Sequence, residues 1–329
     1  MILLYRGTVV ERLVQSIIKA MGEAVTQLRC EDLKPIHHLL MGDRMKPPIF
    51  EYASPSTVTE AVGLLASRDG NAKVISGGQS LMPMLAFRLA APELLVDLKH
   101  LKDLGAIHIG EDGVRLGAKV RWCDIECDTR LAVSHPLLAE AIKHVAHYQI
   151  RNRGTVGGSV AHADPSAEMP GIAMTCEARM TIVGSAGTRA EMADNFFTGP
   201  LQTSLEPDEI LTEVHLPAWP AARRWAFLEF ARRKGDFAMA GVALYYDLDG
   251  NGRIGNAHVG AIGVADRPIR LPEVEAVLNG NPISDKLIAA ASAKARETVD
   301  PPTDIHAPGA YRAALVATLL GRGLKKSAA

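Results

Sequence analysis

The chain has 329 residues, 47% of them hydrophobic, and a formal net charge of −1. This composition predicts packed globular domains and excludes an intrinsically disordered chain. A net charge near zero gives no electrostatic reason to expect a nucleic-acid partner, and no apolar run is long enough to cross a bilayer, so we expect no membrane insertion.

Cysteine usage favours a reducing compartment. The cysteines are Cys30, Cys123, Cys127 and Cys176. The spacing of Cys123 and Cys127 places both on one face of a helix, but no second pair stands at the spacing of a structural zinc or iron–sulfur site, so we expect no metal in this chain. We therefore expect reduced thiols and a cytoplasmic protein.

Residues 1–44 differ from the rest of the chain. Their apolar residues recur at helical intervals between Val9 and Leu28. Met45 resembles the first residue of a natural chain. Two interpretations stay open: an upstream start codon that makes 1–44 a non-native extension, or a genuine helical extension. His37 and His38 are adjacent, so their side chains diverge, and we expect no metal site there.

The chain from Phe50 to about residue 100 predicts a small β-α-β unit. We expect a helix that is capped near Ser54 and ends near Gly70, strands at 73–76 and 94–98, and a segment at 81–88 that continues past Pro83. A turn at residues 77–80 separates the first strand from that continuation.

A second region, about 101–220, begins with a predicted hairpin around residues 111–113. The elements that we expect are strands at 106–109 and 114–118, helices at 121–130 and 136–147, and strands near 178–183 and 210–216. Pro217 and Pro220 mark its end.

In the last region, 221–329, the sequence predicts strands first and helices afterwards. We expect strands at 225–232, 238–248 and 256–263, with a hairpin turn at Asp249-Gly-Asn-Gly252, and then helices at 271–279, 284–297 and 309–321. This order predicts an α+β fold with an antiparallel sheet, in contrast to a doubly wound parallel sheet.

Two glycine-containing segments carry the strongest functional signal. Residues 74–81 read Val-Ile-Ser-Gly-Gly-Gln-Ser-Leu, and residues 154–159 read Gly-Thr-Val-Gly-Gly-Ser. Bare backbone N–H groups hold a pyrophosphate well because no side chain competes. A single Gly-Gly pair is more often a tight turn, but two such segments leave a structural turn and a nucleotide site as equal alternatives.

The familiar nucleotide motifs are absent from the sequence. No G-x-G-x-x-G follows a strand and opens a helix with an acidic residue about 20 positions on, and there is no Walker A pattern. We therefore expect the ligand to be held by loops between strands, and not by one helix N-terminus.

Polar residues after the second segment indicate ligand binding more than catalysis. His162 and Asp164 have no serine in a nucleophile elbow beside them, and Pro165 predicts a bend. The basic run 232–234 ahead of Phe237 is either a solvated strand end or a surface for an anionic group with Phe237 against a flat ring.

Taken together, four motifs resemble a known family. Residues 76–81, 151–159, 161–168 and 233–238 look like those of the medium, FAD-binding subunit of molybdenum hydroxylases, of the carbon monoxide dehydrogenase medium-chain type that also occurs in xanthine dehydrogenase. The resemblance covers about residues 45–325. It implies a fold of the vanillyl-alcohol-oxidase/p-cresol-methylhydroxylase type: an FAD-binding domain at 45–220 with subdomains 45–100 and 101–220, and a C-terminal α+β domain at 221–329.

The resemblance implies a set of FAD-binding residues and no catalytic residue. Positions 74–81 and 155–159 match the family's FAD loops, Asp164 and Glu168 match polar positions near the ribose and ribityl groups, Leu211 matches an apolar position that lines the flavin, and Phe237 stands where many members have Tyr. The full set is Val74, Ile75, Ser76, Gly77, Gly78, Gln79, Ser80, Leu81, Thr155, Val156, Gly157, Gly158, Ser159, Asp164, Glu168, Leu211 and Phe237. Some members carry Lys where Leu228 stands, so that contact is not transferred.

The resemblance also implies an electron-transfer subunit. A large subunit with a molybdenum cofactor would hydroxylate the substrate, and a small subunit with two 2Fe–2S clusters would relay electrons to the FAD of this chain. The FAD would then pass them to an external acceptor such as NAD, a quinone or a cytochrome. We expect a heterotrimer, doubled in some members to a hexamer, and no 4Fe–4S cluster because the cysteine-rich insertion is absent.

Two rival functions remain. The first is a self-contained single-chain flavoenzyme on the same fold, an oxidase or reductase with its own substrate pocket. The second is a cofactor-free assembly or binding protein, which loss of the key glycines would indicate; none is lost here.

Overall fold

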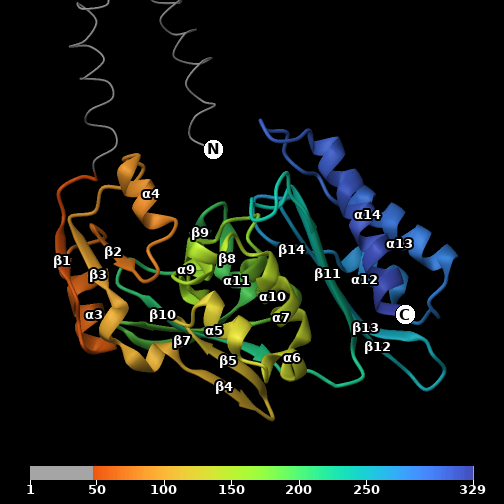
Figure 1. The fold of residues 1–329 in the computed structure, drawn as a ribbon, viewed down its shortest axis with the longest axis horizontal. Coiled ribbons are helices and arrows are strands. Elements are labelled where there is room, and N and C mark those ends of the chain that lie inside the picture. The colour runs from red at the N-terminus through yellow and green to blue at the C-terminus, as the bar shows by residue number, and fades with distance from the viewer. Residues whose placement is uncertain (1–46, 329) are drawn as a thin grey trace, which may run out of the picture. The chain divides into compact units, whose positions relative to one another are not determined.

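Figure 1 presents the computed structural model of the chain, which describes residues 47–328. The predicted helix within residues 9–28, Cys30 and the His37-His38 pair lie outside the described residues. Residues 83–91 belong to a separate compact unit, and Ile49–Met82 with the chain from Pro92 onward form the unit that carries the features below.

Helix α4 (Leu81–Ala86) leads the chain into this separate compact unit. Within it the Leu89 N–H donates to the carbonyl oxygen of Met84 at 2.9 Å, and Arg88 has a left-handed φ of 56° that ends the helix.

The first sheet of the main unit is small and parallel. Its strands are β1 (Glu51–Ala53), β2 (Ala72–Ile75) and β3 (Leu94–Asp97), in the order β1-β3-β2. Helix α3 (Val58–Ala66) buries Ala61, Val62 and Leu65. Its N-cap is Thr57, whose hydroxyl accepts from the Glu60 N–H, and not the predicted Ser54.

The middle sheet is antiparallel, in the order β4-β5-β10-β6-β7. Its strands are β4 (Ile107–Gly110), β5 (Gly113–Gly117), β6 (Arg179–Gly184), β7 (Gly187–Met192) and β10 (Ile210–Pro217). Strand β7 was not predicted, because it is an edge strand with mostly exposed polar residues and lacks an apolar alternation. A short ribbon of β8 (Phe197–Gly199) and β9 (Gln202–Thr203) follows.

Short helices fill one side of this region. They are α5 (Trp122–Cys127), α6 (Leu131–Ser134), α7 (Pro136–Ala141), α8 (Tyr148–Arg151), α9 (Val156–His162), α10 (Glu168–Thr175) and α11 (Ala193–Phe196). The single helix predicted at 136–147 is wrong: α7 passes into a 3-10 turn at Ile142–His144, and Ala146 adopts a left-handed φ of 42° that stops the helix.

The C-terminal sheet has the order β11-β12-β13-β14 and is antiparallel. Its strands are β11 (Arg224–Phe230), β12 (Ala240–Leu248), β13 (Ile254–Ile262) and β14 (Ile269–Arg270). Helices α12 (Pro272–Leu278), α13 (Asp285–Thr298) and α14 (Gly309–Ala328) cover one face of this sheet (Figure 1).

The alternation along β12 explains why its first seven residues are all buried. Val242, Leu244 and Tyr246 point into the core beneath the C-terminal helices. Ala243 and Tyr245 point into the core of the middle region, because successive strand residues face opposite sides. The C-terminal sheet is thus packed on both faces, which joins the middle and C-terminal regions through a continuous apolar contact.

Helix α10 lies closely against β13 because glycines remove the side chains between them. A Cβ on Gly171 would overlap Cγ2 of Ile262, and a Cβ on Gly260 would overlap the Thr175 hydroxyl. The Gly263 N–H also donates to the carbonyl oxygen of Pro165 at 2.9 Å, which ties the end of β13 to the chain just before α10.

The predicted α+β class with a C-terminal α+β region is confirmed. Among the described residues, none of the helices is long and apolar enough to cross a membrane. Cys123, Cys127 and Cys176 are free thiols.

Candidate functional site

The two glycine segments meet in space. The Thr155 hydroxyl donates to Ser76 Oγ at 3.2 Å, which links the second segment to the first. A Cβ on Gly77 would overlap the carbonyl oxygen of Arg153 and lie 2.9 Å from Gly154 Cα. The two backbones are therefore in direct contact, and that contact requires glycine at position 77.

The first segment follows β2 and forms a tight loop. Gly78 has a left-handed φ of 58°, and the Gln79 side chain folds back so that Nε2 donates to the carbonyl oxygen of Gly77 at 2.9 Å. Within residues 47–328, the N–H groups of Gly77, Gly78, Gln79 and Ser80 make no hydrogen bond to another residue. Four neighbouring N–H groups that have no partner among the described residues suit an anion.

The second segment is a helix start, so the expectation of a loop there is wrong. Gly157 and Gly158 lie in the first turn of α9, and Val156 and Val160 are fully buried on its inner face. The helix forms because Thr155 Oγ1 accepts from the Gly158 N–H at 3.1 Å, which is the geometry of an N-cap.

The amides of this second segment are already used inside the protein. The Val156 and Gly157 N–H groups donate to the carbonyl oxygens of Val120 and Ala118 at 2.9 and 2.8 Å. A Cβ on Gly157 would overlap Ala118 Cβ, so this glycine serves close packing against the chain after β5. Ala118 and Val120 were not predicted as site residues, since no pattern in the sequence couples them to the glycines.

The Thr155 hydroxyl has two bonding roles, since it accepts from the Gly158 amide and donates to Ser76. We expect Thr155→Val to lower the free energy of unfolding by about 1–2 kcal/mol, because both the helix cap and the contact between the segments are lost. Urea unfolding followed by circular dichroism measures this change. The matched control Thr318→Val removes an exposed hydroxyl that bonds only within α14 and should change stability by under about 0.5 kcal/mol; equal effects of the two variants would contradict the role of Thr155.

The predicted bend after α9 is present. Ala163 takes a left-handed φ of 52° and ends the helix, and Asp164 Oδ1 then accepts from the Ser166 N–H at 2.8 Å. Burial lowers the pKa of the His162 imidazole, against a smaller opposing effect of Asp164. His162 is therefore neutral at pH 7, which agrees with a lining role in place of a cationic one.

Glu168 is the first residue of α10 and is 6% exposed. Burial, and after it the negative charge of Glu229, raises the pKa of the Glu168 carboxyl to about 8. Glu229 was not among the predicted residues, because nothing in the sequence couples it to Glu168.

Leu211 and Phe237 differ in their surroundings. Leu211 is 4% exposed and lies in the core on β10, beside a bulge in its pairing with β6. Phe237 is 59% exposed on the loop after β11. In the same loop, a Cβ on Gly235 would lie 2.5 Å from His147, which places this loop against the chain before α8.

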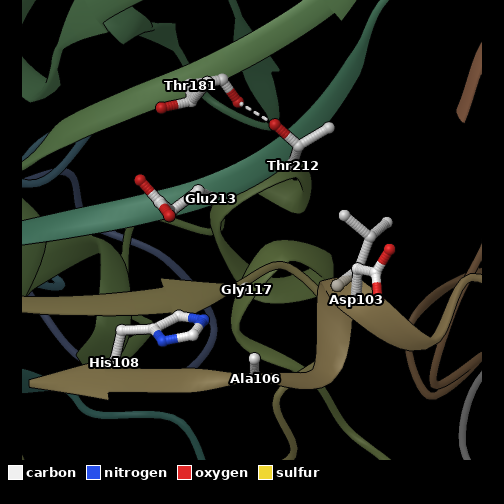
Figure 2. A pocket seen from close by; sticks show the side chains of 8 residues that line it. Asp103, Ala106, His108, Gly117, Thr181, Thr212 and Glu213 are labelled. Atoms are coloured by element: carbon white, nitrogen blue, oxygen red, sulfur yellow. Dashed lines mark hydrogen bonds between the residues drawn. The ribbon is translucent and has the colours of Figure 1, made fainter.

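A separate cavity of about 230 Å³ lies on the middle sheet (Figure 2). It is lined by Asp103, Leu104, Ala106, His108, Gly117, Thr181, Thr212 and Glu213. None of the predicted site residues lines it, and its volume is below the roughly 300–1,000 Å³ of typical ligand pockets. This cavity is not the candidate site.

Comparison with known families identifies the chain. Residues 48–219 match the family described as the FAD binding domain in molybdopterin dehydrogenase, and residues 225–327 match the CO dehydrogenase flavoprotein C-terminal domain. The chain belongs to the FAD-binding medium subunits of the molybdenum hydroxylases. The predicted resemblance is thereby confirmed, and the medium subunit is part of an oxidoreductase.

Individual relatives match this medium subunit over nearly the whole of their own length. It is 38% identical to the nicotine 6-hydroxylase medium subunit of Paenarthrobacter nicotinovorans, over 87% of this chain and 99% of that protein. It is 34% identical to the carbon monoxide dehydrogenase medium chain of Hydrogenophaga pseudoflava, over 85% and 97%.

Solved structures agree with this assignment. The carbon monoxide dehydrogenase of H. pseudoflava that lacks the Mo-pyranopterin moiety of its cofactor has a chain with a TM-score of 0.83 and 35% identity, covering 86% of this medium subunit and 98% of that chain. Quinoline 2-oxidoreductase of Pseudomonas putida 86 has one with a TM-score of 0.82 and 38% identity, at the same coverage.

Proposed function

We propose that this medium subunit carries FAD and transfers electrons within a molybdenum hydroxylase complex. A small subunit with 2Fe–2S clusters supplies the electrons, and an external acceptor receives them. A large subunit with a molybdenum cofactor binds and hydroxylates the organic substrate. The observation that carries the proposal is the direct contact between the two glycine segments, beside four backbone N–H groups that have no partner in the part of the chain that the structure describes.

The residues present fit FAD. The four N–H groups at positions 77–80 suit the pyrophosphate, and a side chain at Gly77 would fill the space where the two backbones touch. Asp164 and Glu168 follow the second glycine segment along the chain, and we assign these two residues to the neighbourhood of the ribose and ribityl groups. Leu211 and Phe237 are assigned to the flavin ring.

These assignments separate the chemistry that FAD supplies from the role of the polypeptide chain. FAD supplies the redox chemistry when it is bound. The chain itself binds the dinucleotide, orients it through the first glycine loop and shields part of it from water. No nucleophile or acid–base group is required, because the organic substrate reacts on another subunit. The free thiols of Cys123, Cys127 and Cys176 support a reducing, cytoplasmic location.

An absorption spectrum of the purified chain, before and after heat release of bound ligand, tests the proposal. We expect about one equivalent of non-covalent flavin, and substrate-driven bleaching only when the two partner subunits are present. A colourless but folded chain would overturn the proposal. Bleaching by a substrate in the isolated chain, or flavin that stays with the band on a denaturing gel, would favour a self-contained flavoenzyme.

A further inference from the structure

Arg312 is a buried arginine that joins the ends of two neighbouring strands. It lies near the start of α14, and its side chain is 6% exposed. Nη1 donates to the carbonyl oxygen of Met239 at 2.6 Å and to that of Gly263 at 2.8 Å. Nη2 donates to Asp304 Oδ2 at 2.8 Å. Met239 directly precedes β12 and Gly263 directly follows β13, so one planar guanidinium holds both strand ends.

The bond to Met239 anchors the loop that carries Phe237. This loop, residues 231–239, connects β11 to β12. The Phe237 side chain is 59% exposed, so burial does not fix its position. At the end of the loop the Met239 N–H donates to the carbonyl oxygen of Phe230 at 2.8 Å, while the Met239 carbonyl accepts from Arg312. The position of Phe237 therefore depends in part on these backbone bonds.

The ion pair of Arg312 with Asp304 supports the same loop at its other end. Oδ1 of Asp304 accepts from the N–H groups of His306 and Ala307 at 2.8 and 3.0 Å, which shapes a turn before α14. The carbonyl oxygen of His306 in this turn accepts from Arg232 Nη2 at 3.4 Å. Arg312 thus acts on the loop directly and also through the turn that it holds.

The bond to Gly263 reaches the bend that carries Asp164. The Gly263 N–H donates to the carbonyl oxygen of Pro165 at 2.9 Å, while its own carbonyl accepts from Arg312. Pro165 directly follows Asp164 in the chain. A Cβ on Gly263 would lie 2.7 Å from the carbonyl oxygen of Ala238, so the end of β13 also touches the end of the loop. The loop and the bend are therefore tied to each other at one place.

We propose that Arg312 is a positioning residue of the FAD site. Through Met239 it fixes the loop of Phe237, and through Gly263 it fixes the bend of Asp164, so the two stretches keep one relative position. Its importance for FAD rests on the proposed function, which assigns Phe237 and Asp164 to the cofactor. The anchoring of the loop by Arg312 does not rest on it.

The first test is limited trypsin digestion of the full chain without flavin. The loop contains three exposed trypsin sites, at residues 232–234. Without the guanidinium the buried carbonyl oxygens reach water only when the loop opens, so we expect Arg312→Gln to accelerate cleavage at these sites about tenfold. Arg312→Lys keeps the charge and supplies three donors, and it should restore most of the resistance. Mass spectrometry of the fragments measures the rate at each site.

The matched control is Arg223→Gln. Arg223 is 11% exposed and pairs with Asp247 at 2.8 Å, towards the other end of β12. This variant should also lose stability but should be cleaved at residues 232–234 at the wild-type rate, in buffer where urea unfolding shows every variant to be folded. A wild-type rate in Arg312→Gln, or the same acceleration in Arg223→Gln, would overturn the proposal.

Asp304→Ala keeps the test decisive if Arg312→Gln does not fold. It removes only the carboxylate partner of Arg312 and leaves the two bonds to carbonyl oxygens. We expect it to accelerate cleavage at residues 232–234 by about threefold. Cleavage of this variant at the wild-type rate would count against the anchoring in the same way.

The second test titrates FAD into the flavin-depleted chain and records the visible circular dichroism of the bound flavin. Arg312→Gln should weaken FAD binding about tenfold and change the dichroism band, and Arg312→Lys should recover much of both. Arg223→Gln should match the wild type. Unchanged affinity and dichroism in Arg312→Gln would overturn the link to FAD. If the loop responds to Arg312→Gln but the wild type binds no FAD, the proposed function fails instead, so the two failures are distinguishable.

Discussion

Gly77→Ala is expected to abolish FAD retention and to lower the free energy of unfolding by about 3 kcal/mol. The added methyl group would overlap the carbonyl oxygen of Arg153, and that oxygen belongs to backbone held by the Gly154 N–H bond to Ile150 at 2.7 Å. Neither backbone segment can move without separating the two glycine segments. Urea unfolding gives the stability, and the flavin-to-protein absorbance ratio after desalting gives the retention.

Gly63→Ala is the matched control for this prediction. Gly63 lies inside α3, and a Cβ there meets no atom within 4 Å. We expect this variant to retain FAD and to gain up to about 1 kcal/mol, because alanine favours the helix. If Gly77→Ala kept both stability and FAD at the level of the control, the contact between the two segments would not be what positions the cofactor.

Acid should destabilise the fold through His135, with an effect of several kcal/mol. His135 is fully buried, its Nδ1 accepts from the Leu138 N–H at 3.2 Å as the N-cap of α7, and its ring lies 4.6 Å from that of Trp219. Burial lowers the pKa of this imidazole from 6.5 to about 3. Because the unfolded chain binds a proton that the folded chain excludes, stability is full above about pH 6.5 and falls by about 1.4 kcal/mol per pH unit below it, until the folded pKa is reached.

Urea unfolding at several pH values between about 7 and 4 measures this slope. His135→Asn should reduce the slope, because asparagine keeps an N-cap acceptor and does not titrate. His100→Asn is the control: His100 is exposed, so its replacement should leave the slope unchanged. A wild-type slope that His135→Asn does not alter would show that other groups govern acid unfolding.

Local sequence patterns predicted most of the regular elements. The hairpin at residues 249–252 is an example: Asp249 Oδ1 accepts from the N–H groups of Asn251 and Arg253, and Gly252 takes the positive φ of 73° that the turn requires. Helices α12 and α13 lie close to their predicted ranges because their apolar spacing is a local signal. Helix α14 begins at the predicted residue but continues past the predicted end at 321 to Ala328. Strand β7 was missed because an exposed edge strand carries no such signal.

Local sequence signals predict the structure of one glycine segment and fail for the other. The sequence by itself determined that residues 74–81 form a strand followed by a turn, since β-branched residues end at Gly77-Gly78. It also determined the family, because four motifs recur together. It did not determine that residues 156–162 are helical: Gly-Gly disfavours a helix locally, and the helix depends on the Thr155 cap and on burial of Val156 and Val160 against the middle sheet.

Only the tertiary structure decided which distant residues meet. The contact of Gly77 with Arg153, the bond between Thr155 and Ser76, and the close packing of Gly157 on Ala118 each join segments from different elements. Such contacts depend on how sheets and helices pack, and packing is governed by shape and burial summed over many residues. A single sequence carries local propensity and periodicity, but it does not state which faces of the helices and sheets will meet.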